Sequence, residues 1–246
     1  MPTQIRDLKE ILNPGDSLPP QAWQLRVVQS EDCQSYVAWN TTTQEGLIVD
    51  PKRDDLAAYR KIVDDTPLKG FRWLAVVDTH THADHISCSP ELAEEMKAPW
   101  IMSHLSPSPR AQIRIGRECI FPSAAAPIYF WPTPGHTADS ITLAWGPYLF
   151  GGDTVLYGDT GRDDLPTGDA GRHFESITLL KKHAKPDWIL LPGHDHKGGR
   201  ASSWRSQLEG LNPSLNEAKD DFIREAAAFS APAPLLLKEA LRENFK

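Results

Sequence analysis

Short apolar runs separated by polar turns occupy most of this chain. Runs of four to eight residues that are rich in β-branched and aromatic side chains, and that end at turn-forming residues, are typical of strands. On this basis we expect strands at 24–29, 35–40, 46–50, 73–77, 128–131, 140–144, 148–150 and 188–191. The segments 30–34 and 41–45 are polar and predict hairpin turns between the first three strands.

Helical spacing appears between the predicted strands. In the segment 54–64, Leu56, Tyr59, Ile62 and Val63 fall on one side of a helix. Further helices are expected at 90–96, 173–183, 215–228 and 235–243. Strands and helices alternate without a low-complexity linker, so we predict an α/β fold with residues 1–246 forming a single layered domain.

Composition narrows the class of protein. The 246 residues are 40% apolar and 24% charged, as in an ordinary globular protein with a substantial core. The net charge is −7 and no basic run is present, which argues against a nucleic-acid partner. The apolar runs are too short to span a bilayer, and the segment 1–12 lacks the apolar core of a secretory signal. We therefore expect a cytoplasmic protein without a membrane partner.

The strongest chemical signal directly follows the predicted strand 73–77. There the chain reads Thr79-His80-Thr81-His82-Ala83-Asp84-His85. A strand end directs His80 and His82 to the same face, because side chains alternate with period two. A turn after them would bring Asp84 and His85 to a neighbouring point. This pattern predicts a site for one metal ion, or for two ions side by side.

Three more predicted strands end in a turn that carries a metal-ligating residue type. These turns hold His136 after Pro134-Gly135, Asp153 after Gly151-Gly152 and His194 after Pro192-Gly193. Each residue alone is more often a turn residue than a metal ligand, but their recurrence at strand ends favours convergence on one site. Nitrogen and oxygen donors of these types suit zinc, iron or manganese. The residues outside this pattern, which we expect to have structural roles, are His104, His173, His183 and Asp195.

The ordered set His80-x-His82-x-Asp84-His85, Gly135-His136-Thr137, Gly152-Asp153 and Gly193-His194 resembles the signature of the metallo-β-lactamase superfamily. The resemblance covers roughly residues 27–215 and implies an αββα sandwich with a metal site at one edge. The segments 161–169, 193–200 and 211–215 are similar to those of persulfide dioxygenases, which are relatives of glyoxalase II.

This resemblance implies one Fe(II) per chain, held by the catalytic residues His80, His136 and Asp153, with coordination positions left open. A small-molecule thiol persulfide, such as glutathione persulfide, would react there with O2 to give sulfite and the thiol. The remaining ligand-type residues would then orient the ligands through hydrogen bonds; they are His82, Asp84, His85 and His194.

The alternative is a glyoxalase II-type hydrolase with two metals, either zinc or a mixed pair. One metal would lie on His80, His82 and His136, the other on Asp84, His85 and His194, with Asp153 as the bridge. A metal-bound hydroxide would then attack a thioester or ester. A non-catalytic protein on this scaffold would be expected to have lost ligands, and none is lost.

Several residues bear on the substrate and on assembly. His196 replaces a tyrosine of the dioxygenase pattern, and Ser87-Cys88 replaces Thr-Gly. These differences leave open which thiol carries the persulfide, glutathione or another. His196 and Arg200 are candidate substrate contacts. Arg162 is expected to pair with Asp163 or Asp164 and to fix its loop. The sequence leaves a homodimer open, with two tryptophans as candidate interface residues, Trp23 and Trp204. Cys33, Cys88 and Cys119 are expected to be small thiols with buried or half-buried side chains.

Overall fold

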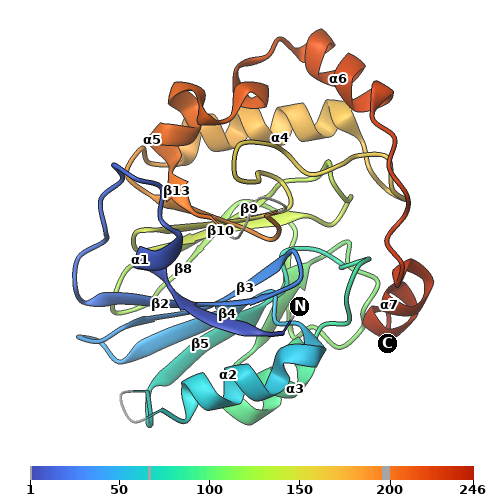
Figure 1. Ribbon diagram of the computed structural model, residues 1–246. Coiled ribbons are helices and arrows are strands. Elements are labelled where there is room, and N and C mark those ends of the chain that lie inside the picture. Colours follow the sequence, from blue (N-terminus) through green and yellow to red (C-terminus); the bar gives the residue numbers. More distant parts are fainter. Residues whose placement is uncertain (1, 66–67, 196–199) are drawn as a thin grey trace.

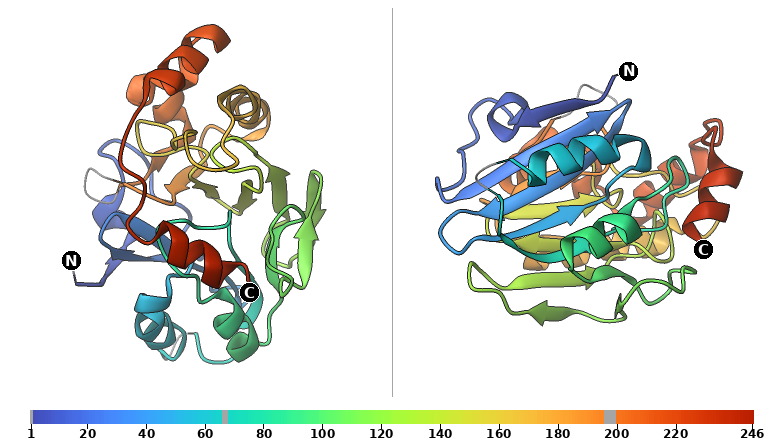
Figure 2. Two further views of the ribbon diagram at one scale, coloured as in Figure 1. Left: turned by 90° about the vertical axis from the view of Figure 1, so that its right-hand side faces the viewer. Right: turned by 90° about the horizontal axis from the view of Figure 1, so that it is seen from below.

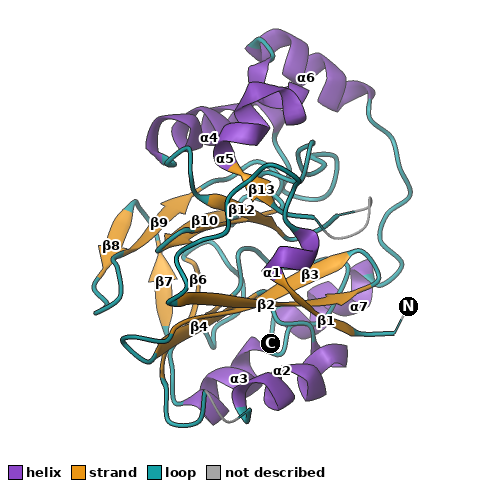
Figure 3. Cartoon of the chain, turned by 60° about the vertical axis from the view of Figure 1, so that its left-hand side comes forward, coloured by secondary structure: helices purple, strands orange, loops and turns teal. Residues whose placement is uncertain are grey.

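The computed structural model describes residues 2–65, 68–195 and 200–246. Two mixed β-sheets pack face to face, with helices on their outer sides (Figures 1 and 3). The first sheet is ordered, in sequence, β1 (Gln4–Asp7), β2 (Trp23–Ser30), β3 (Cys33–Asn40), β4 (Glu45–Val49), β5 (Arg72–Val77), β6 (Trp100–Ser103) and β7 (Ile113–Ile115). Its strands are antiparallel up to β4 and parallel from β4 onward.

The second sheet lies above the first in Figure 1. Its strands are β8 (Cys119–Phe121), β9 (Ile128–Pro132), β10 (Ile141–Trp145), β11 (Tyr148–Gly152), β12 (Ile189–Pro192) and β13 (Ser202–Ser203). The pair β11 and β12 is parallel, and the other pairs are antiparallel. The crossover between β11 and β12 contains the longest helix, α4 (Ala170–His183).

The remaining helices cover the outer faces and one side. The first sheet is covered by α2 (Leu56–Val63) and α3 (Ser89–Met96), and the second by α4 with α5 (Trp204–Ser206) and α6 (Lys219–Ala228) (Figure 2). The short helix α1 (Leu8–Ile11) follows β1, while α7 (Leu237–Asn244) lies far from α6. No helix among the described residues is both long and apolar enough to cross a membrane.

The core is divided into layers by the alternation of side chains along the strands. In β3, Tyr36 faces the other sheet, where its ring lies 5.7 Å from that of Phe150, while Val37 packs under the outer helices. Every residue of β3 is buried. Because β3 is covered on both faces, its central residues 36–39 form a continuous apolar run rather than a strict alternation of apolar and polar residues.

The predicted strands are confirmed to within two residues at each end, and the predicted sandwich of sheets and helices is confirmed. The helix expected at 173–183 begins earlier, at Ala170, because the Asp169 side chain accepts a hydrogen bond from the Arg172 backbone N–H and caps it. The helix expected at 215–228 begins later, because Pro213–Asn216 forms a separate 3-10 turn. The strands that the sequence did not predict are short or peripheral; they are β1, β6, β7, β8 and β13.

Candidate metal centre

The ligand-type residues lie on loops that meet at one edge of the sandwich. The loop after β5 in the first sheet carries His80 to His85, and the loops after β9, β11 and β12 in the second sheet carry His136, Asp153 and His194. The two sheets are joined at this edge by a hydrogen bond from the Ile141 N–H to the Thr79 carbonyl, 2.7 Å long. The site is therefore assembled from both halves of the molecule.

His80, His136 and Asp153 form a buried cluster whose ligand atoms all lie within 4.8 Å of one another. We call these residues the triad. The Oδ2 atom of Asp153 is 3.5 Å from Nε2 of His136 and 3.9 Å from Nε2 of His80. Donor atoms that each lie about 2.0–2.2 Å from one metal ion are separated from one another by distances similar to these two. The triad therefore fits around one ion.

The orientation of His80 follows from the residue before it. The Thr79 hydroxyl donates its proton to the Asp50 carboxylate at 2.9 Å and lies 3.0 Å from His80 Nδ1. Because a hydroxyl has a single proton to donate, it accepts the hydrogen bond from the His80 Nδ1–H. The lone pair of His80 then lies on Nε2, which faces Asp153.

His136 is oriented in the same sense by a backbone group. Its Nδ1–H donates to the carbonyl oxygen of Arg162 at 2.7 Å, which leaves the lone pair on Nε2. Hydrogen bonds of this kind fix the tautomer and ring orientation of metal-binding histidines. Arg162 itself pairs with Asp164 through two hydrogen bonds of 2.6 and 2.7 Å, so the predicted pairing is confirmed.

Asp153 divides its two carboxylate oxygens between partners. Oδ1 accepts from His194 Nδ1 at 2.8 Å, whereas Oδ2 faces the two triad histidines. Burial would raise the pKa of Asp153, but His194 and the triad histidines outweigh it and lower that pKa. Burial and the neighbouring His82 hold the pKa of His80 well below its ordinary value. The triad thus combines a carboxylate with a neutral imidazole at His80.

A second group adjoins the triad through His194. The Oδ2 atom of Asp84 lies 3.1 Å from His194 Nε2, 2.9 Å from His85 Nδ1 and 3.1 Å from the Cys33 Sγ that donates to it. We call Cys33, Asp84, His85 and His194 the Asp84 chain. Burial lowers the pKa of both histidines, but the adjacent carboxylates prevail: the pKa of His85 rises to about 10, and that of His194 rises well above its ordinary value. A protonated imidazole has no lone pair to offer a metal.

Cys33 is the member of this chain that the sequence did not reveal. It was expected only as a buried thiol, and its position more than fifty residues before Asp84 offers no local signal. The hairpin between β2 and β3 brings it under the metal-binding loops, where the Gln34 N–H also donates to the Gly193 carbonyl at 2.8 Å. Cys88 is fully buried beside the carbonyls of Pro51 and Lys52, as expected for a small core thiol.

His82 lies beside the triad but turns toward a different pair of residues. Its Nε2 is 3.2 Å from Asp50 Oδ1 and 3.8 Å from Asp78 Oδ1, and neither ring nitrogen makes a hydrogen bond. The Asp78 carboxylate accepts hydrogen bonds from three other side chains, those of Ser87, Ser89 and Trp100. The structure therefore groups His82 with two carboxylates beneath the metal-binding loop.

Two glycines permit the close approach of these loops. Gly152 has a φ of +51°, and a Cβ placed there would lie 2.5 Å from the Thr79 hydroxyl oxygen. A Cβ on Gly193 would lie 2.6 Å from Asp153 Oδ1. A side chain at either position would displace a group that orients the triad, which accounts for the glycines that precede Asp153 and His194.

The other predicted residues that the structure describes lie outside this centre. Arg200 is exposed, with its guanidinium 5.2 Å from the centre of the Tyr157 ring, and His196 lies outside the described residues. His173 has the expected structural role, with Nδ1 2.6 Å from Asp163 and Nε2 2.7 Å from the Thr154 carbonyl. Trp204 is wholly buried in the core under α4, so it does not form an interface as considered from the sequence, because its side chain is out of reach of a partner.

Comparison with known proteins identifies the family to which this chain belongs. Residues 31–211 match the metallo-beta-lactamase superfamily, and the chain belongs to it. It is 25% identical over 224 residues to the human mitochondrial persulfide dioxygenase ETHE1, covering 86% of this chain and 83% of that protein. A hydroxyacylglutathione hydrolase of Nitrobacter hamburgensis is 28% identical over 212 residues, covering 80% of each.

Among solved structures, the crystal structure of ETHE1 from Myxococcus xanthus superposes with a TM-score of 0.81 at 25% identity, covering 90% of this chain and 97% of that one. The predicted superfamily, its αββα fold and the resemblance to the persulfide dioxygenase branch are confirmed. The family and the buried cluster together support a metal cofactor.

Proposed function

We propose that this protein is a non-haem iron-dependent dioxygenase that oxidises a low-molecular-weight thiol persulfide, such as glutathione persulfide, with O2 and water to sulfite and the thiol. The proposal rests on a difference between the triad and His194 in which donor atoms face a possible metal ion. The triad directs two imidazole nitrogens and one carboxylate oxygen toward a common point, whereas His194 directs both of its ring nitrogens to carboxylates. The persulfide dioxygenases among the relatives support the reaction.

Two histidines and one carboxylate on one side of an ion suit ferrous iron and leave positions for other ligands. Iron bound there would supply the electron transfer that allows O2 to react with a sulfur atom. The protein holds the two reactants adjacent in a buried site. Thr79 and the Arg162 carbonyl fix the triad histidines, while His194 holds Asp153. We assign Arg200 and His196 to contacts with the thiol carrier, and Arg200 suits a carboxylate of glutathione.

The proposal is tested with the purified protein by measuring iron per chain and oxygen uptake with glutathione persulfide. We expect one iron per chain, oxygen consumption and the formation of sulfite. Loading with two metals, together with thioester cleavage and no oxygen uptake, would overturn the proposal in favour of the hydrolase.

A specific observation favours that second candidate: the buried His85 Nε2 makes no hydrogen bond, as a metal-binding nitrogen would not. A cytoplasmic location and a homodimer stay predictions.

A further inference from the structure

The C-terminal part of the chain, residues 229–246, crosses from one half of the sandwich to the other. We call it the strap. It leaves α6 above the second sheet and runs along one side of the molecule to α7, beside the first sheet (Figures 1 and 2). Leu235 and Leu236 of the strap are exposed, while Ala240 of α7 is buried. What it does contact are two segments that orient the metal centre.

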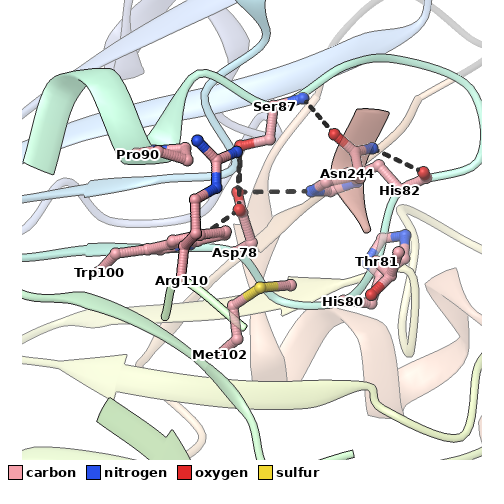
Figure 4. A pocket seen from close by; sticks show the side chains of 10 residues that line it. All are labelled: Asp78, His80, Thr81, His82, Ser87, Pro90, Trp100, Met102, Arg110 and Asn244. Carbon is pink, nitrogen blue, oxygen red and sulfur yellow. Dashed lines mark hydrogen bonds and ion pairs between the residues drawn. The ribbon is translucent and has the colours of Figure 1, made fainter. Parts of the chain in front are cut away.

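The first contact is made by Asn244 at the end of α7. Its side-chain Nδ2 donates to the carbonyl oxygens of His82 and His85, at 2.9 Å each, and its Oδ1 accepts from the Ser87 N–H, also at 2.9 Å. Figure 4 shows the contacts with His82 and Ser87. Asn244 and Ala240 are the buried residues of α7. One side chain thus satisfies three backbone groups of the loop that carries His80 to His85.

These contacts restrain the loop at a critical place. A loop at a strand end has no sheet partners for its backbone groups, and buried backbone groups without partners are costly. The end of this loop pairs with segment 51–53 through the bridge between Lys52 and Ser87, and Asn244 supplies a donor for the carbonyl oxygens of His82 and His85. Its contacts begin two residues after His80. They therefore restrict the course of the loop that presents the His80 imidazole.

The second contact is made by Arg162. Its guanidinium donates to the carbonyl oxygens of Ala231 and Pro232, at 2.8 Å each, and lies 5.4 Å from the centre of the Phe229 ring. The carbonyl oxygen of the same arginine accepts the hydrogen bond that orients His136. The strap is therefore tied to both sides of the centre, to the His80 loop through Asn244 and to the His136 acceptor through Arg162.

We propose that the strap is a clamp on the metal centre and that Asn244 is a positioning residue, which sets metal affinity and ligand geometry by holding the loop of His80 from behind. This inference rests on the triad as the metal site of the proposed function, but not on the reaction carried out there. The partners of Asn244 are two backbone carbonyl oxygens and one backbone N–H. The short side-chain amide carries both the donor and the acceptor that these three groups need.

The experiment uses the full-length protein with Co(II) alone, whose visible spectrum reports ligand geometry. Asn244→Ala removes all three hydrogen bonds. Outer residues that orient metal ligands typically contribute about 10–100-fold to metal affinity, and we expect a weakening of this order together with a changed spectrum at saturation. Glu239→Ala, on the exposed side of the same helix, is the matched control and should leave both unchanged.

Asn244→Asp provides a second variant that keeps the side-chain size and the acceptor for Ser87 but loses the amide donor. It decides the matter if Asn244→Ala does not fold, as judged by circular dichroism of the metal-free protein. Unchanged Co(II) affinity and spectrum in a folded Asn244 variant would overturn the clamp while leaving the proposed metal site intact. A wild-type protein that binds no Co(II) would instead overturn the metal site, and the clamp with it.

Discussion

The triad and the Asp84 chain are each built around two histidines and one aspartate and lie next to each other, yet their hydrogen bonds differ. Each triad histidine gives its Nδ1 proton to a neutral acceptor, the Thr79 hydroxyl or the Arg162 carbonyl. In the Asp84 chain, the histidines instead contact carboxylates. A neutral acceptor orients a neutral ring and leaves a lone pair, whereas a carboxylate favours the protonated ring.

The pKa directions of three of these histidines also differ between the two groups. The pKa of His80 is held well below its ordinary value by burial and by His82, while the pKa of His85 and that of His194 are raised by Asp84 and Asp153 against the effect of burial. The partner of each ring, more than the residue itself, therefore decides whether a histidine is ready to bind a metal. Four predictions test this distinction.

The largest effect is expected for Asp153→Ala, which removes the carboxylate of the triad and the partner of His194. Two imidazoles alone form an incomplete site, so the purified variant should contain no iron and show no oxygen uptake above background. Metal analysis and an oxygen electrode make the measurement. Asp187→Ala, whose side chain is 89% exposed, is the control. Retention of stoichiometric iron in Asp153→Ala would show that the ion lies elsewhere.

Thr79→Val tests how the triad is oriented, since valine keeps the shape of threonine and lacks the hydroxyl. It leaves the His80 Nδ1–H without a partner and removes the hydroxyl donor from Asp50 Oδ2, while Asp50 Oδ1 still accepts from the backbone N–H of residue 79 at 2.6 Å. We expect iron affinity to fall by about 10–100-fold, the usual effect of losing a group that orients a ligand. A chelator competition gives the affinity. Thr178→Val, on the outer surface of α4, should behave as the wild type, and an equal affinity in Thr79→Val would contradict the assigned tautomer.

Much of this arrangement could be predicted from the sequence. The strand at 73–77 and the turns at Gly135, Gly152 and Gly193 are local patterns, and local patterns specify where a strand ends. Because strand ends in layered α/β folds gather at one edge, the convergence of the ligand-type residues followed.

The partners of those residues could not be predicted. Thr79 directly precedes His80, but its link to Asp50 depends on the parallel pairing of β4 with β5. Cys33 and Asn244 reach the centre through packing over more than fifty and more than one hundred and fifty residues. No periodicity or spacing encodes contacts at such separations. The roles of otherwise identical histidines therefore depended on tertiary structure.

His82→Asn separates one metal from two. In the proposed one-iron site, His82 lies with Asp50 and Asp78 and is not a ligand, so the iron content should stay the same. Turnover should fall by about tenfold, as a neighbour of the ligands is lost. In the two-metal scheme the same substitution removes a ligand and lowers the metal content. Metal per chain and oxygen uptake, measured on one preparation, distinguish these outcomes.

The smallest effect concerns stability and pH in the metal-free protein. Asp84 raises the pKa of His85 to about 10 against the opposing effect of burial, whereas an unfolded histidine has a pKa near ~6.5. A raised folded-state pKa means that the protonated ring stabilises the fold fully below the unfolded value, and that this contribution is lost as the pH rises toward about 10. His85→Gln, which keeps a donor but no charge, lacks this dependence. Urea unfolding of both proteins at neutral and alkaline pH should show the advantage of the wild type shrinking as the pH rises, and a constant difference would mean that His85 is neutral, like His80.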